Sequence, residues 1–156
     1  MNYLSGYLLT EMLLPIIPRS PDSRIVNVAS GAQSPIDFDD PMMENGYSGG
    51  RSYGQSKLAQ ILHAFDLAEE LEGTGVRVNA LHPATLMDTN MVRSAGVQPR
   101  SSVEEGLEAV MNLIVPSDLG TGGYFNGTRE SRANAQAYDE EARAPFRQLS
   151  EELIGG

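Results

Sequence analysis

The sequence contains no cysteine, and lysine occurs only once, so arginine supplies every other basic side chain. Without cysteine, the chain can form neither a disulfide framework nor a thiolate metal site. Basic clusters are also absent, and the formal net charge is −10. Because nucleic acids and anionic membranes both attract a cationic face, this composition argues against either as a partner. The cysteine count leaves the compartment open, and we take a cytoplasmic location as the default.

A long uninterrupted apolar run is missing as well. The N-terminal stretch "MNYLSGYLLTEMLLPIIPRS" has no basic start, is interrupted by Glu11, and is too short to cross a bilayer. It therefore fits neither a signal peptide nor a membrane span. Its apolar spacing predicts instead a buried helix that ends near Pro15 or Pro18. The repeating positions are Leu4, Leu8, Met12 and Ile16.

Two short β-branched runs predict buried strands, one over residues 24–30 and the other over residues 76–83. The glycines at 73 and 75 mark the end of a helix between them. That helix carries apolar residues at helical spacing on one face. They are Leu58, Ile61, Leu62, Phe65 and Ala68.

The later part of the chain continues this alternation. A helix is expected after residue 101, where Ser101 with Glu104, or Ser102 with Glu105, can form a capping box. A third strand is expected at "GGYFNG", and a last helix around residues 142–153 contains Pro145, which implies a kink or a late start. Alternating helices and strands predict an α/β layered fold with parallel strands. At 156 residues, the chain fits one domain.

The single lysine, Lys57, lies in "GGRSYGQSKLAQIL", four positions after Tyr53. Residues four apart share one helix face, and a nearby cation favours an ionised phenol, which makes the phenol usable as an acid or base. A slender lysine also suits contact with a ribose-like diol better than a planar guanidinium does. By itself, however, the spacing also fits a solvated helix face. Ser30 ends the preceding strand, at the edge where open α/β sheets bind ligands.

Ser30 at a strand end, "YGQSK" on a leucine-rich helix and the following "VRVNALHPA" together resemble the short-chain dehydrogenase/reductase family. The resemblance extends over nearly the whole chain, although the C-terminal third matches loosely. It implies the C-terminal half of a Rossmann-like, doubly wound parallel sheet, with residues 1–156 in a single domain. It also implies an NAD(P)-dependent oxidoreductase that interconverts small carbonyl and alcohol substrates.

The resemblance further implies roles for individual residues. Tyr53 corresponds to the family's general acid/base, and Lys57 to the residue that assists it and holds the nicotinamide ribose. Ser30 corresponds to the donor that polarises the substrate carbonyl. Asn2, in "NYLSGYLLT", corresponds to the asparagine that holds a water in the proton relay.

After the second strand, "HPATLMDT" resembles the family's Pro-Gly loop, which lies against the nicotinamide. Pro83 matches that loop, while Ala84 stands where glycine is usual. Either Thr85 or Thr89 corresponds to the threonine that contacts the cofactor, so both stay open as cofactor-binding residues.

The family's Gly-rich phosphate loop and its selector for the adenine ribose have no counterpart in this sequence. The choice between NAD and NADP is therefore open. Two functions also remain open: the oxidoreductase, and a truncated, catalytically silent scaffold or dimerisation module. We expect homo-oligomers through the first two helices, and little dinucleotide binding by the 156-residue chain alone.

No metal site is expected, because the two histidines, His63 and His82, are too few to build one with the acidic loop around Asp40. That loop fits a solvated segment. Four methionines flank the predicted site and suit either an adaptable apolar substrate pocket or plain core filling. They are Met42, Met43, Met87 and Met91.

Overall fold

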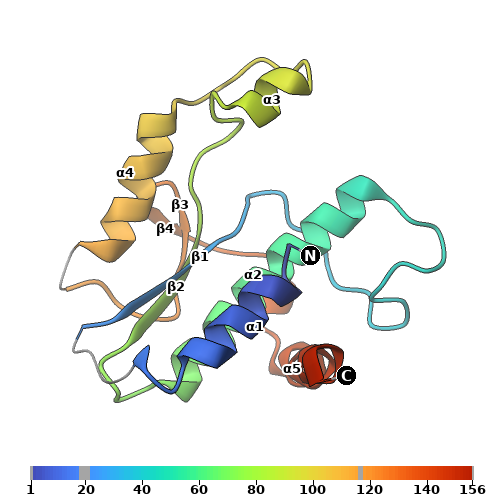
Figure 1. Ribbon diagram of the computed structural model, residues 1–156, viewed down its shortest axis with the longest axis vertical. Coiled ribbons are helices and arrows are strands. Elements are labelled where there is room, and N and C mark those ends of the chain that lie inside the picture. The colour runs from blue at the N-terminus through green and yellow to red at the C-terminus, as the bar shows by residue number, and fades with distance from the viewer. Residues whose placement is uncertain (1, 18–21, 116–117, 156) are drawn as a thin grey trace.

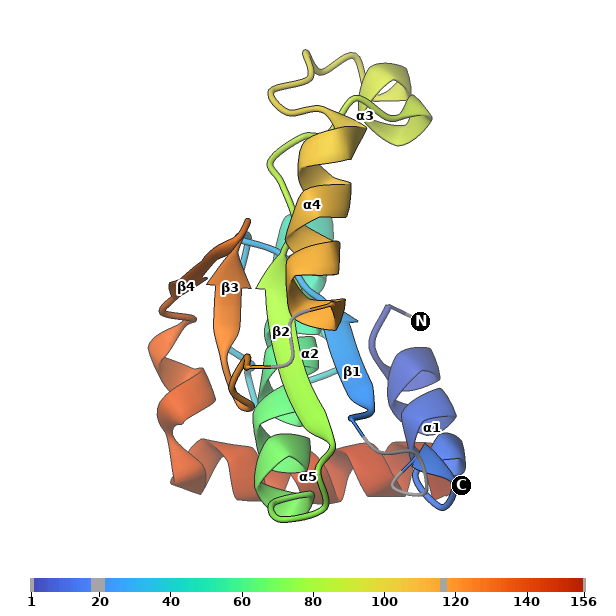
Figure 2. The same cartoon turned by 90° about the vertical axis from the view of Figure 1, so that its left-hand side faces the viewer.

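The computed structural model describes residues 2–17, 22–115 and 118–155, and its centre is one four-stranded sheet (Figures 1 and 2). The strand order is β1 (Arg24–Val28), β2 (Arg77–His82), β3 (Tyr124–Asn126) and β4 (Arg129–Ser131). The first three strands are parallel, whereas β4 pairs antiparallel with β3. The predicted α/β fold with a parallel sheet is thus confirmed, with one antiparallel edge strand that the sequence pattern did not indicate.

Helices cover both faces of this sheet (Figure 2). On one face, α2 (Gly49–Glu70) packs on β1 and β2, with α1 (Leu4–Leu13) and α5 (Glu140–Gly155) outside it. On the other face lies α4 (Val103–Ile114), preceded by the short helix α3 (Asn90–Ser94). The 3-10 turn η2 (Ala135–Tyr138) joins the sheet to α5. This is the layered arrangement of a Rossmann-like half.

The first helix forms where predicted, but its predicted burial is wrong. Its end, just before Pro15, agrees with the sequence pattern, while Pro18 lies outside the described residues. Within α1 only Tyr7 is buried, and Met12 is 70% exposed. The reason is that α1 is covered by α2 and α5 on one side only. Its apolar outer face consists of Leu8, Leu9, Met12 and Leu13.

In contrast, α2 is buried on every side over residues 61–68. The predicted apolar face packs in the main core, and the opposite side of the helix is covered by α1 and α5. Arg143 of α5 forms ion pairs with Asp66, at 3.1 Å, and with Glu69, at 2.7 Å. Oligomerisation through the first two helices stays a prediction. Of these two helices, α1 is the one with an exposed apolar side, because α5 covers the outer side of α2.

Two details of the later helices were left open by the sequence. Of the two capping-box alternatives, the structure selects the one with Ser102, whose Oγ accepts a hydrogen bond from the backbone N–H of Glu105 at 3.1 Å. The late start proposed for the last helix is wrong, because α5 begins five residues before Pro145 and continues through it. Proline removes one backbone donor, and the buried Phe146 and Ser150 beyond it hold the helix against α1 and α2.

Burial of His63 on the outer side of α2 makes the stability of the fold pH-dependent. Its ring packs against Tyr7, and Nε2 lies 3.7 Å from a carboxylate oxygen of Glu11. Desolvation lowers the pKa of His63 from 6.5 to about 4, so the imidazole is neutral near neutral pH. In the unfolded chain the same group binds a proton at higher pH. Stability is therefore expected to fall as the pH drops from 6.5 towards 4, because only the unfolded state gains the proton there.

Urea unfolding of the chain and of His63→Phe at several pH values tests this expectation. Over that interval the native chain is expected to lose about 3 kcal/mol more than the variant, since one pKa unit corresponds to about 1.4 kcal/mol. Carboxyl groups away from this position contribute equally to both proteins, so the difference reports His63 together with its neighbour Glu11. Parallel pH profiles for the two would contradict a neutral buried histidine.

Candidate active site

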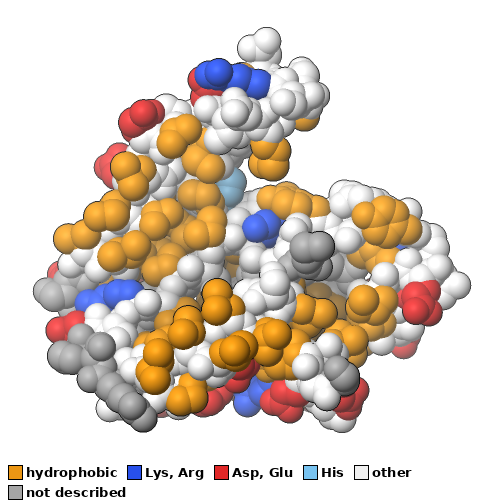
Figure 3. Space-filling view, viewed as in Figure 1, with side chains coloured by type: hydrophobic (Ala, Val, Ile, Leu, Met, Phe, Trp, Pro, Cys, Tyr) orange, Lys and Arg blue, Asp and Glu red, His pale blue; other side chains and the backbone are white. Residues whose placement is uncertain are grey.

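The site predicted from the sequence lies at the carboxyl edge of the parallel strands. The backbone N–H of Ala29 donates to the carbonyl of Leu81 at 2.8 Å, so the segments that leave β1 and β2 begin side by side. Ser30 follows the first strand, and Pro83 and Thr85 follow the second. Figure 3 shows this edge as a hollow between the α3 segment and the N-terminal part of α2. Adjacent parallel strands thereby bring the predicted residues to one edge of the sheet.

Ser30 is buried and held by its neighbours. Its Oγ accepts a hydrogen bond from the backbone N–H of Ala32 at 3.1 Å, and its carbonyl accepts from the Tyr124 hydroxyl at 3.1 Å. The turn that follows lies so close to α2 that a Cβ added at Gly54 would be 2.3 Å from the Ser34 Oγ. Gly54 is the residue after Tyr53. Its missing side chain allows the segment after Ser30 to approach α2 at the tyrosine.

Tyr53 and Lys57 lie one turn apart on α2, as the spacing predicted. Tyr53 is 42% exposed, and the Lys57 Nζ lies 5.6 Å from the centre of the tyrosine ring. The same Nζ donates to the carbonyl of Val28 at 3.0 Å and to the Gln60 Oε1 at 3.1 Å. Partial burial lowers the pKa of Lys57 from its usual value. The ammonium is thus fixed between the end of β1 and the tyrosine.

Asn2 joins this arrangement through a residue that the sequence reasoning missed. The Gln60 side chain accepts from Lys57 and donates, through Nε2, to the backbone carbonyl of Asn2 at 2.9 Å. A hydrogen-bonded chain therefore runs from Lys57 to the start of α1. The available signal was the position of Gln60, three residues after the lysine on the same helix face.

The last residue of β2, His82, is a second residue that the sequence reasoning missed. Its Nε2 lies 3.0 Å from the Thr85 Oγ1, and its ring fills the space beside Gly31, where an added Cβ would lie 3.4 Å from the imidazole. Thr89, the alternative to Thr85, uses its hydroxyl to cap α3 by accepting from the Val92 N–H at 3.5 Å. The only sequence signal for a role of His82 was its position at the end of a strand, directly before Pro83.

The four methionines do not gather around this edge. Met42 and Met43 line a separate cavity beside α2, whereas Met87 packs against Gly106 of α4 and Met91 is 79% exposed on α3. The interpretation of all four as the lining of one substrate pocket is therefore wrong, because only Met42 and Met43 line that cavity. Only the second pair belongs to the segment that follows Pro83.

The acidic side chains of the loop at residues 37–44 are used in hydrogen bonds and an ion pair close to the loop itself. The Asp40 carboxylate accepts from the backbone N–H groups of Glu44 and Asn45, at 2.8 Å each, and Asp37 pairs with Arg51 at 3.1 Å. Within residues 2–17, 22–115 and 118–155, no group of three or more acidic or histidine side chains is arranged to hold a metal ion. A search of the same ranges finds no helix with the length and apolar character of a membrane span.

A parallel sheet with a serine after one strand and a Tyr-x-x-x-Lys helix beside it is the arrangement that the resemblance to the short-chain dehydrogenase/reductase family implied. Comparison with known proteins agrees, since a sequence profile described as short chain dehydrogenase matches residues 1–100. The chain belongs to the short-chain dehydrogenase family. The predicted resemblance is thereby confirmed.

Individual relatives extend over the whole chain. Human retinol dehydrogenase 14 is 34% identical across 99% of this chain and 51% of its own length. Mouse retinol dehydrogenase 13 is 33% identical across 99% of this chain and 52% of its own length. The chain thus spans about half the length of the curated relatives it matches.

Solved structures show the same fold. A protein from Mycobacterium paratuberculosis superposes with a TM-score of 0.73 at 27% identity, over 97% of this chain and 56% of its own. An NADPH-bound carbonyl reductase from chicken fatty liver superposes with a TM-score of 0.64 at 23% identity, over 85% of this chain and 54% of its own. The second likeness concerns the fold alone.

Proposed function

We propose that this chain carries the catalytic half of an NAD(P)-dependent oxidoreductase that interconverts a carbonyl and an alcohol, with Tyr53 as the acid/base. The observation that carries the proposal is the connected set around Lys57. Its ammonium lies beside the tyrosine ring and is held by Val28 and Gln60, and Gln60 continues the hydrogen bonding to Asn2. A chance Tyr–Lys spacing on a solvated helix face gives no reason for these contacts.

The residues at this edge fit the nicotinamide end of a dinucleotide. An ammonium has three donors, and two of those on Lys57 are used within the chain, which leaves one for a ribose hydroxyl. Thr85, positioned by His82, offers a hydroxyl in the loop that begins at Pro83. We favour Thr85 over Thr89 for this role, because Thr89 caps α3. A motif for the pyrophosphate is absent from the sequence, so no residue of this chain is assigned to it.

In the proposed reaction a bound nicotinamide supplies or accepts the hydride. The chain's own residues handle the proton and the charge. The Ser30 hydroxyl donates to the substrate oxygen and stabilises the negative charge that develops there. The Tyr53 hydroxyl delivers its proton to that oxygen during reduction, and the deprotonated Tyr53 oxygen takes the proton back during oxidation. The Lys57 ammonium places a positive charge beside the tyrosine ring. The Gln60 side chain connects Lys57 to the backbone carbonyl of Asn2, just before α1.

The substrate class that fits best is a small apolar carbonyl or alcohol. Met91 and Leu86 are exposed on the segment after Pro83, which borders the site. Relatives named as retinol dehydrogenases suggest an apolar alcohol of that kind. The choice between NAD and NADP, a cytoplasmic location and the assignment of residues 1–156 to one domain stay predictions.

One observation favours the second function, a catalytically silent scaffold: the sequence has no Gly-rich phosphate loop. Calorimetric titration with NADH and NADPH, followed by turnover of retinal and of shorter apolar aldehydes, separates the two. Saturable binding with loss of the reduced cofactor supports the oxidoreductase in this chain. If the 156-residue chain shows neither dinucleotide binding nor turnover, the hypothesis of a catalytically silent scaffold is supported for this chain.

Exchange of Lys57 for arginine tests the role of the lysine. Lys57→Arg conserves charge, but a planar guanidinium does not reproduce the contacts of Nζ with Val28 and Gln60. We expect kcat to fall by about 10²-fold, which is typical of displacement by about 1 Å in a catalytic group. Arg51→Lys, the reverse exchange on an exposed position of the same helix, is the control and should leave kcat unchanged. Nearly native turnover in Lys57→Arg would contradict the assignment.

A further inference from the structure

The segment that follows β1 carries Ser30 but has no regular secondary structure. Residues 30–37 adopt neither helix nor strand, yet Ser30 and Ile36 are both buried. Backbone groups in such a segment need hydrogen-bond partners from elsewhere, because no helix or strand pairs them. Residues 133–138, about one hundred positions later in the chain, supply partners at two places. The position of Ser30 therefore depends on a distant part of the sequence.

The far end of this segment is held by Gln136, in η2. The Gln136 Oε1 accepts a hydrogen bond from the backbone N–H of Ile36 at 2.7 Å, and its Nε2 donates to the Ile36 carbonyl at 3.1 Å. One side-chain amide thus pairs both backbone groups of a residue, as a neighbouring antiparallel strand does in a sheet. These two bonds fix Ile36 on the C-terminal part of the chain.

The near end is held by Gln33. Its Nε2 donates to the Ser30 carbonyl at 3.0 Å, and its Oε1 accepts from the backbone N–H of Asn134 at 2.7 Å. A single side chain thereby joins the serine to the same C-terminal part of the chain. We refer to Gln33 and Gln136 together as the glutamine clamp.

The C-terminal side of the glutamine clamp is itself fixed. Ala133 and Ala137 are buried in the main core, at 8% and 0% exposure. The Asn134 Oδ1 accepts from the backbone N–H of Gln136 at 3.0 Å. The Tyr138 hydroxyl accepts from the Ala133 N–H, also at 3.0 Å. Close-packed core residues move little, so the clamp has a rigid support.

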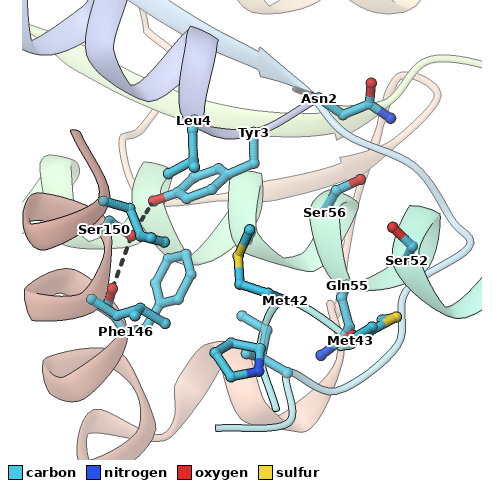
Figure 4. Close-up of a pocket in the computed structure, with 15 residues that line it drawn as sticks. Asn2, Tyr3, Leu4, Met42, Met43, Ser52, Gln55, Ser56, Phe146 and Ser150 are labelled. Atoms are coloured by element: carbon cyan, nitrogen blue, oxygen red, sulfur yellow. Dashed lines mark hydrogen bonds between the residues drawn. The ribbon is translucent and has the colours of Figure 1, made fainter. Parts of the chain in front are cut away.

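Beyond Ile36 the chain enters a loop that borders a cavity of about 340 Å³. Met42 and Met43 of this loop line the cavity beside α2 (Figure 4). A loop beside a cavity lacks packed neighbours on that side, which leaves its movements less restricted. The bonds between Gln136 and Ile36 lie between this loop and Ser30 in the chain. They keep movements of the loop from reaching the serine.

We propose that Gln136 and Gln33 are positioning residues that fix the Ser30 hydroxyl for the carbonyl–alcohol reaction. This role rests on the proposed function, in which Ser30 donates to the substrate oxygen. Donors to a developing negative charge are effective when they are held within roughly 0.5 Å of the productive position. Both glutamines act through Ser30 rather than on the reacting atoms.

Amide hydrogen exchange in the 156-residue chain tests the glutamine clamp without any turnover. Gln136→Met keeps the approximate size of the side chain but removes its donor and acceptor. The Ile36 N–H then loses its partner and is expected to exchange about tenfold faster than in the native chain. Gln148→Met, the same substitution at an exposed position of α5, is the control and should leave this rate unchanged. An unchanged rate in Gln136→Met would overturn the proposal.

Initial rates, measured in a form of the protein that turns over, test the positioning role. Gln136→Met is expected to lower kcat about tenfold, while dinucleotide affinity stays within about twofold because the contacts of Lys57 are unchanged. In Ser30→Ala, which lacks the hydroxyl, adding Gln136→Met should lower kcat no further. Gln33→Met leaves Ile36 paired and should show the same dependence on Ser30.

Equal losses of kcat with and without the Ser30 hydroxyl would show that the glutamine clamp only stabilises the fold, and would overturn the proposal. Native kcat in both glutamine variants would overturn it as well. If Gln136→Met did not fold, Gln33→Met would provide both tests, with the Asn134 N–H as the exchange readout. Absence of turnover in the native protein would refute the proposed function instead, and the exchange rates would still decide whether the clamp holds the segment.

Discussion

Replacing Tyr53 with phenylalanine is expected to lower kcat for carbonyl reduction by roughly 10²- to 10⁴-fold, the usual contribution of a positioned acid/base. The variant loses one hydroxyl and keeps the ring beside the Lys57 Nζ, so α2 and its contacts should be unchanged. Dinucleotide affinity is expected to remain within about twofold, because Lys57 keeps its own hydrogen bonds. Initial rates of NAD(P)H oxidation, measured in the longest form of the protein that turns over, provide the test.

Tyr47→Phe is the matched control for this experiment. Tyr47 lies just before α2 and is 72% exposed, so the same loss of a hydroxyl there should leave kcat unchanged. If Tyr53→Phe retained most of the native kcat, a different group would have to transfer the proton. The pH profile of the native enzyme gives a second readout, since an acid/base group imposes a pH dependence that Tyr53→Phe should lose.

The elements that surround this site were predictable because each has a strong local pattern. Both buried strands were found to within two residues, and the apolar face of α2 was identified from its helical spacing. Their order in the chain then led to parallel pairing, which brings Ser30 and Pro83 to one edge. The short strand β4 was missed, because three exposed residues, from Arg129 to Ser131, carry no alternation of apolar and polar side chains.

Contacts between distant segments were not predictable in the same way. Periodicity assigns one buried face to a helix, whereas α2 also buries Gln55, His63 and Asp66 on its other side. These polar residues resemble surface positions in the sequence. The rings of Tyr3 and Tyr7, near the start of the chain, pack against His63. Asp66 pairs with Arg143 of α5, which lies about eighty residues later in the chain.

In the candidate site, too, the residues with local signals were predicted and those that depend on distant contacts were not. Ser30, Tyr53 and Lys57 were recognised from spacing and from position relative to a strand, which are local signals. Gln60 and His82 were missed, because their roles depend on which atoms they meet in space, Asn2 in one case and Thr85 in the other. Side-chain hydrogen bonds of this kind follow from tertiary packing and leave no regular spacing in the sequence.

The largest effect expected for the isolated chain is self-association through the side that carries the free edge of β1. On one face of the sheet, α1 presents an apolar strip in which Leu9 is 58% exposed. On the other face, α4 presents a second strip in which Leu107 is 59% exposed (Figure 3). Between them, β1 pairs on one side only among the described strands, and Val28 at its end is 45% exposed. Contiguous apolar surface around an unpaired strand edge favours association.

We therefore expect the 156-residue chain to elute as an oligomer, and Leu9→Lys combined with Leu107→Lys to shift the mass measured by light scattering to that of a monomer. Both positions are exposed, so each lysine can be solvated in the monomer and disfavours only the buried interface. Met91→Lys, at a 79% exposed position on α3 and outside both strips, is the matched control and should remain oligomeric. A monomeric native chain would refute the expectation. Dissociation by Met91→Lys as well would show that net charge, rather than this surface, controls assembly.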